Sequence, residues 1–72
     1  MKSLKIDSPF ITLGQLLKYA DLIQSGGQAK HFIQENTILL NGIHELRRGK
    51  KIYPGDVVII NHDTAFRVDQ KP

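Results

Sequence analysis

The first third of the chain carries two successive hydrophobic patterns. Residues 3–7 (SLKID) alternate polar and apolar side chains, which predicts a short half-buried strand that ends before Pro9. Thr12 and Gln15 then have the spacing of a capping box, and leucine and alanine residues follow at i, i+3 and i+4. A helix is therefore expected from residue 13 to about residue 23.

A second helix is expected directly afterwards. Ser25 precedes Gln28 by three residues, as in another capping box, and the two glycines between them allow the chain to turn sharply. Apolar residues at positions 29, 32 and 33 continue at helical spacing. Asn36 is expected to close this helix in the left-handed conformation.

From residue 37 the pattern changes to short apolar runs separated by turn signals, which is typical of a small sheet. Ile38 to Leu40 is followed by Asn41-Gly42, the strongest short-range signal for a tight type I′ hairpin turn, and Ile43 starts the return strand. Residues 44–51 are expected to form a loop or an irregular edge of the sheet. Further strands are expected at 52–53, 57–60 and 65–68, with turns between them.

These elements predict an α+β fold, with two N-terminal helices packed on a small twisted, mostly antiparallel β-sheet. The side chains expected to form its core are Leu13, Leu16, Leu17, Phe32, Ile33, Leu39, Val57 and Ile59. Tyr53 and Phe66 are expected to pack in the core or at its edge rather than to stack on bases. Asn41 is expected to serve the hairpin turn, and a hydrogen bond from its side chain to RNA is the lesser alternative.

Composition narrows the classes of protein to which such a chain can belong. Its 72 residues leave room for one core, so a single domain over residues 1–72 is expected, with the motif core at about residues 12–60. The lack of cysteine and of any long apolar run favours a cytoplasmic protein. A net charge of +3 and an isoelectric point of about 9.5 favour polyanionic partners.

The sequence contains no motif that is typical of catalysis. It lacks a nucleophile elbow, a zinc-protease helix and a phosphate-binding loop, so no enzyme activity and no cofactor are expected. The histidines at positions 31, 44 and 62 do not have the spacing of metal ligands, so no metal site is expected either.

One run of charge is the principal candidate for binding. Residues 47–51 (RRGKK) hold four cations, no carboxylate and one glycine, a composition suited to a chain of phosphates. The start of the second helix offers backbone amides and further polar side chains to the same ligand. The candidate RNA-binding residues are Ser25, Gly26, Gly27, Gln28, Lys30, His31, Arg47, Arg48, Lys50 and Lys51.

The ordered set of these motifs resembles a known family. The segments LGQLLKYADLIQSGGQAKHFI, ILLNG and RRGKKIYPGDVV are similar, in order and spacing, to the RNA-binding domain named after ribosomal small-subunit protein four, the S4 domain or alpha-L motif. The match covers about two-thirds of the chain, from Leu13 to Val58. The stretches 25–30 and 47–51 further resemble the small stand-alone bacterial branch of that family, the YaaA/YbcJ-like proteins.

The resemblance implies two helices on a small sheet, with RNA held by the second helix and by the basic segment beyond the hairpin. It also implies structured RNA, ribosomal RNA first, as the partner, a ribosomal subunit or its assembly proteins as further partners, a role in ribosome assembly or translation, and a monomer that does not contact membranes. Many family members carry an arginine within the region 25–28, where this chain has glycines. The bidentate contact of such an arginine is therefore not expected here.

Two other functions remain open from the residues themselves. The stretch from Ile38 to Ile60 resembles part of the ubiquitin-like sulfur carriers, although the chain ends in DQKP rather than Gly-Gly, so a protein-docking module is one alternative. Non-specific DNA binding is the other, because phosphate contacts alone do not separate duplex DNA from RNA.

Overall fold

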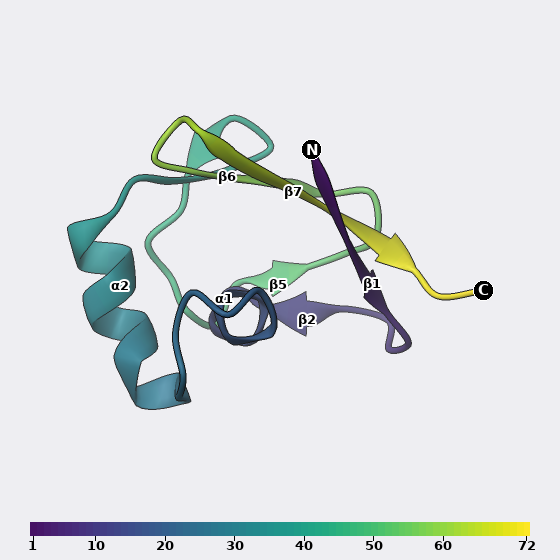
Figure 1. Ribbon diagram of the computed structural model, residues 1–72, viewed down its shortest axis with the longest axis horizontal. Coiled ribbons are helices and arrows are strands. Elements are labelled where there is room, and N and C mark those ends of the chain that lie inside the picture. Colours follow the sequence, from purple (N-terminus) through teal and green to yellow (C-terminus); the bar gives the residue numbers. More distant parts are fainter.

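A computed structural model describes all 72 residues as one α+β unit. Its helical and strand elements are β1 (Lys2–Ile6), β2 (Ile11–Thr12), α1 (Leu13–Tyr19), a 3-10 turn (Gly26–Gln28), α2 (Ala29–Glu35), β3 (Ile38–Leu40), β4 (Ile43–His44), β5 (Lys51–Ile52), β6 (Val57–Ile60) and β7 (Thr64–Gln70). In Figure 1 the strands β6 and β7 lie above α1, which is seen end-on, and α2 stands to the left. No helix has the length and apolar content that a membrane span requires.

The sheet has five strands in the order β1-β7-β6-β3-β4, and β2 and β5 form a separate two-stranded sheet. All pairings are antiparallel except the one between β1 and β7, which is parallel and aligns Leu4 with Val68. The predicted α+β fold class is confirmed in two respects: the structure has two helices, and its sheet is mostly antiparallel. The helices are not the first element, however, because β1 precedes them and joins the sheet at its edge.

Helix α1 begins as the sequence predicts but ends earlier. Gln15 donates its backbone N–H to the Thr12 hydroxyl at 3.2 Å, and the Gln15 side chain accepts from the Thr12 N–H at 2.9 Å, which completes the capping box. Helix α1 ends at Tyr19, not near residue 23, because Asp21 adopts a left-handed conformation with φ of 62°. The prediction of a longer helix was wrong because Ile23 belongs to the loop after α1. It is nevertheless buried in the core, so its apolar side chain fitted the helical pattern.

The end of α2 also corrects a prediction. Asn36 is extended, with φ of −131° and ψ of 155°, rather than left-handed. Its side-chain amide instead donates to the Phe32 carbonyl at 2.8 Å, satisfying one of the carbonyls left open at a helix end. The hairpin prediction is confirmed, since Asn41 and Gly42 have φ of 51° and 85°, as a type I′ turn requires.

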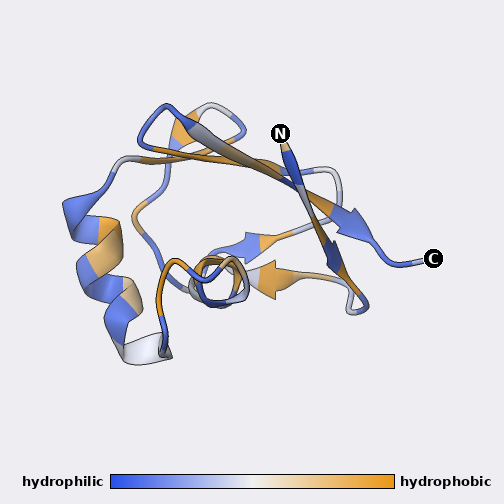
Figure 2. Ribbon diagram, viewed as in Figure 1, coloured by the Kyte–Doolittle hydropathy of each residue, from blue (hydrophilic) through white to orange (hydrophobic).

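The core lies between the helices and one face of the sheet. Leu13, Leu16 and Leu17 are fully buried, as predicted, and Figure 2 shows the apolar side of α2 turned towards α1 and the sheet. Phe32 is only partly buried against this core.

The sheet buries the opposite set of side chains from the one predicted. The expected core residues Leu39, Val57 and Ile59 are only partly buried. Their neighbours Ile38, Leu40, Val58 and Ile60 fill the core instead. Both faces of these strands are apolar, so the sequence does not show which face turns inward, and a shift by one residue exchanges the two sets.

Candidate nucleic-acid interface

The basic segment 47–51 is attached by its backbone to the start of α1. Leu13 donates its N–H to the Lys50 carbonyl at 2.8 Å, and Gly14 donates to the Arg48 carbonyl at 2.9 Å. The first N–H groups of a helix have no partner within the helix, so the loop carbonyls satisfy two of them. Strand β5 adds its pairing with β2, which aligns Lys51 with Thr12. The loop is therefore a docked segment, whereas the sequence indicated its charge but not this attachment.

This docking places one residue from each predicted half of the site, Arg48 and Gly26, at the same hollow. A hollow of about 290 Å³, called here the loop–helix hollow, is lined by Thr12, Gly14, Gln15, Gly26, Ala29, Arg48 and Gly49. A Cβ atom built on Gly14 would lie 3.4 Å from the Arg48 carbonyl oxygen and 3.6 Å from the Ala29 Cβ. These are ordinary van der Waals distances, so Gly14 lies in contact range of both the loop and the first residue of α2.

The other cations of the segment line a second and larger hollow. It has a volume of about 460 Å³, and we call it the Tyr53 hollow. Its lining residues are Leu40, Asn41, Ile43, Glu45, Arg47, Lys50, Lys51, Tyr53 and Asp56. Arg48 thus lines one hollow, while Arg47, Lys50 and Lys51 line the other.

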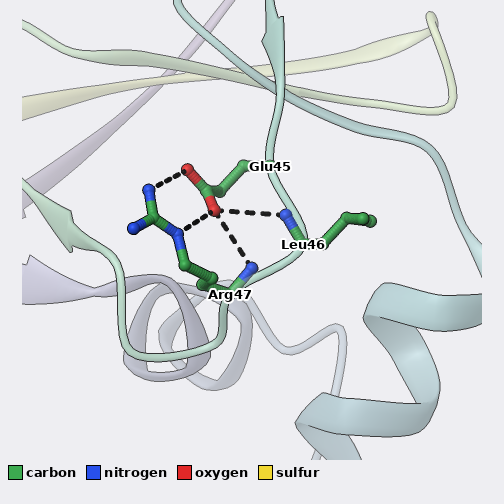
Figure 3. Close-up of polar contacts among 3 residues, drawn as sticks. All are labelled: Glu45, Leu46 and Arg47. Carbon is green, nitrogen blue, oxygen red and sulfur yellow. Dashed lines mark hydrogen bonds and ion pairs between the residues drawn. The ribbon is translucent and has the colours of Figure 1, made fainter.

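Arg47 differs from the other three cations of the segment because it forms an ion pair with Glu45. The Arg47 Nε donates to Glu45 Oε2 at 3.0 Å, and the backbone N–H groups of Leu46 and Arg47 donate to the same oxygen at 3.2 and 3.0 Å (Figure 3). Glu45 is the only buried charged residue. The hydrogen bond from the Arg47 side chain, opposed by desolvation, lowers the pKa of the Glu45 carboxyl, and the same bond raises the pKa of Arg47.

The sequence reading missed Glu45, although it lies only two residues before the basic run. Because its carboxylate neutralises Arg47, the segment presents fewer free charges than its composition indicates. Arg48, Lys50 and Lys51 form no ion pair with any carboxylate of the chain. These three side chains, defined here as the free cations of the loop, are the ones available to an anionic ligand.

The second helical segment starts as a 3-10 turn, and α2 proper begins at Ala29. The Gln28 side-chain oxygen accepts from the backbone N–H groups of Gln24 at 2.6 Å and Ser25 at 3.2 Å, so it stabilises the turn itself. Ser25 and Lys30 are exposed and line neither hollow of the loop.

His31 lies at a third hollow. This one has a volume of about 360 Å³ and is lined by Leu22, Ile23, Gly27, Gln28, His31, Phe32, Glu35 and Asn36. Of the predicted residues in this segment, Gly26 thus shares a hollow with the basic loop, whereas Gly27, Gln28 and His31 line a different one. No three His, Asp or Glu side chains lie close enough together to hold a metal ion.

Comparisons with known proteins agree with this arrangement of motifs. The sequence model of the S4 domain family matches residues 4–69 of the chain. A protein of Bacillus subtilis (strain 168) named "Probable ribosome maturation protein RlbA" is 52% identical over 65 residues, which cover 90% of this chain and 92% of that protein. The family resemblance stated from the sequence is thereby confirmed.

Proposed function

The chain belongs to the S4 domain family, and on that premise we propose that it binds structured RNA, with ribosomal RNA as the expected target. The proposed role is in ribosome assembly or translation. It is supported by the similarity to the Bacillus subtilis protein, whose name refers to ribosome maturation. The proposal is one of binding, and it assigns no reaction to the chain.

One observation carries the proposal: a basic loop of defined backbone borders the same hollow as the start of the second helical segment. Two hydrogen bonds from α1 hold the loop, and Arg48, Lys50 and Lys51 have no carboxylate partner. An ordered backbone loses little further conformational freedom on binding, so it can present its cations at a fixed spacing to phosphates.

The free cations of the loop would contact phosphates along one strand of the RNA, and Gly26 lets the backbone of the ligand approach α2 closely. Such contacts position the protein without reading base edges in the deep major groove of an RNA helix. The proposed recognition is therefore of RNA shape and charge. Lys30 and His31, on other parts of the α2 surface, would add contacts at the margin.

The test is a fluorescence-anisotropy titration against a structured ribosomal RNA fragment, a DNA duplex and a single strand at several salt concentrations. Preferential binding of the RNA fragment, with log affinity falling linearly against log salt, is the expected result. Equal affinity for the DNA duplex would support the non-specific DNA binder instead. Absence of binding to all three would overturn the proposal and favour a protein-docking module.

A further inference from the structure

Tyr53 lies at the edge of the fold rather than in the core, with its ring against that of Phe10. Its residue surface is 48% exposed, whereas Phe66, for which the same expectation was made, is 3% exposed and lies in the core. Tyr53 lines the Tyr53 hollow together with the cations Lys50 and Lys51. The Tyr53 ring is not part of the buried core, and neither lysine forms an ion pair, so these side chains are free to contact a ligand.

The position of Tyr53 is held from two sides. The Tyr53 backbone N–H donates to Asp56 Oδ2 at 2.8 Å, and Asp56 Oδ1 accepts from the Asn41 side chain at 3.0 Å. On the other side, the Phe10 ring lies 5.7 Å from the Tyr53 ring, centroid to centroid, at an interplanar angle of 48°. Lys51 Nζ lies 4.8 Å from the Phe10 centroid. The ring and its neighbouring cation are thus ordered before any ligand arrives.

The carboxylates of the hollow are already engaged by protein partners. Glu45 is bound to Arg47, and Asp56 accepts from Tyr53 and Asn41. Asn41 is also engaged, since its side-chain nitrogen donates to Asp56 Oδ1 at 3.0 Å and its side-chain oxygen accepts from the Val57 N–H at 2.9 Å. The groups left for a ligand are the Tyr53 ring, the exposed Ile43 side chain and the two lysines.

This combination fits one ligand chemistry well. A nucleotide has an aromatic base with an apolar face and an anionic phosphate a short distance away, and unpaired RNA bases commonly stack on aromatic side chains. The volume of about 460 Å³ lies in the range of roughly 300–1,000 Å³ that small ligands occupy. A base within a duplex cannot enter, because both of its faces are covered by neighbouring bases.

We propose that the Tyr53 hollow receives one unpaired nucleotide of the bound RNA, with its base on the Tyr53 ring and its phosphate beside Lys50 and Lys51. This inference rests on the proposed RNA binding and specifies its substrate class, a helix interrupted by a bulge or a loop. The protein then distinguishes such a site from continuous duplex by a stacking contact, in addition to charge.

The first experiment compares three hairpin RNAs that share one stem: one with a bulged adenosine, one with an abasic nucleotide at the bulge, and one without a bulge. The wild-type protein is expected to bind the adenosine bulge at least about five-fold more tightly than the abasic bulge, because only the base is removed. Tyr53→Leu should abolish this preference, and Tyr53→Phe should retain it. Tyr19→Leu is the matched control, since Tyr19 is 54% exposed on α1 and does not line the hollow.

A second measurement does not depend on the fold of a Tyr53 variant. The chain has two tyrosines and no tryptophan, so in Tyr19→Phe the only tyrosine emission comes from Tyr53. Saturation with the adenosine-bulge RNA should quench this emission, and the abasic RNA should quench it clearly less.

The outcomes separate this inference from the proposed function. If wild-type protein binds none of the RNAs, the RNA-binding proposal fails and the inference fails with it. If it binds all three hairpins equally, or if Tyr53→Leu keeps the preference for adenosine, only the stacking inference is overturned. Unchanged tyrosine emission on saturation would overturn it as well.

Discussion

Arg67 on strand β7 and the cations of the basic loop differ in whether a carboxylate partner is present. On β7, Arg67 donates through Nε and a terminal nitrogen to the two oxygens of Asp69, at 2.9 and 3.2 Å. Asp69 also accepts from the Ser3 hydroxyl, and the Arg67 hydrogen bond, followed by that of Ser3, lowers the pKa of the Asp69 carboxyl. In the basic loop, only one cation of four has such a partner.

From this difference we expect that pairing, rather than the number of cations, determines which surface is available to polyanions. A surface ion pair of matched charges presents little net field to an approaching ligand, and exposed pairs of this kind contribute little to stability. Three unpaired cations within four residues produce a local positive potential that attracts phosphates. The following predictions test this contrast.

The largest effect is expected from neutralising the free cations of the loop. A variant with Arg48→Gln, Lys50→Gln and Lys51→Gln should bind structured RNA at least about ten-fold more weakly at low salt. Its salt slope should be smaller by roughly 2 to 3, since each lost phosphate contact removes roughly 0.7–0.9. Anisotropy titrations over several salt concentrations measure both quantities.

The matched control removes the same charge elsewhere. A variant with Lys5→Gln, Lys18→Gln and Lys71→Gln also lowers the net charge from +3 by three, to zero. It should retain most of the affinity, because those side chains lie outside the loop. Equal losses in the two variants would show that total charge, and not the unpaired loop, determines binding.

A second effect is expected at Glu45, in stability rather than in affinity. Because folding lowers the pKa of this carboxyl, its contribution stabilises the protein above the ordinary glutamate pKa and is lost as the pH falls through the lowered value. Glu45→Gln should reduce the free energy of unfolding at neutral pH by about 1 kcal/mol, discounted for the exposure of Arg47. It should also flatten the dependence of stability on pH in acid.

Chemical denaturation at several pH values checks this prediction, with Glu35→Gln as the control because Glu35 is exposed and forms no ion pair. RNA affinity at low salt should not fall in Glu45→Gln, since Arg47 then becomes a fourth free cation. A large loss of affinity in the folded variant would show that the carboxylate holds the loop in its binding conformation.

A smaller effect is expected on α2. Replacing Lys30 and His31 with glutamine should weaken RNA binding by only about two- to five-fold at low salt, because at most one or two phosphate contacts are lost and neither side chain lines a hollow of the loop. The same anisotropy titration measures it. No change at all would confine the interface to the basic loop and the start of the second helical segment.

The smallest effect is expected at the paired cation of β7. Arg67→Gln should leave both RNA affinity and the midpoint of thermal unfolding almost unchanged, because its charge is already matched by Asp69 in an exposed pair. A clear loss of RNA affinity in this variant would contradict the contrast between paired and unpaired cations.

The sequence by itself determined the local features of this protein. The capping box of Thr12 and Gln15 at the start of α1 and the type I′ turn at Asn41-Gly42 follow from interactions between residues a few positions apart. Such interactions form in any tertiary context that leaves the backbone free, so the residue types alone indicate them. The sequence also showed the basic run at residues 47–51 and the order of motifs that is typical of the S4 domain.

Only the tertiary structure decided the features that join distant parts of the chain. These are the parallel pairing of β1 with β7, the docking of the basic loop on α1, and the face of the sheet that carries Val58 rather than Ile59 into the core. Strand register and side-chain partners depend on contacts between segments far apart in sequence, and an apolar run on both faces leaves that choice open. For the same reason only the structure showed that Glu45 engages Arg47 and that Tyr53 is left exposed beside the lysines.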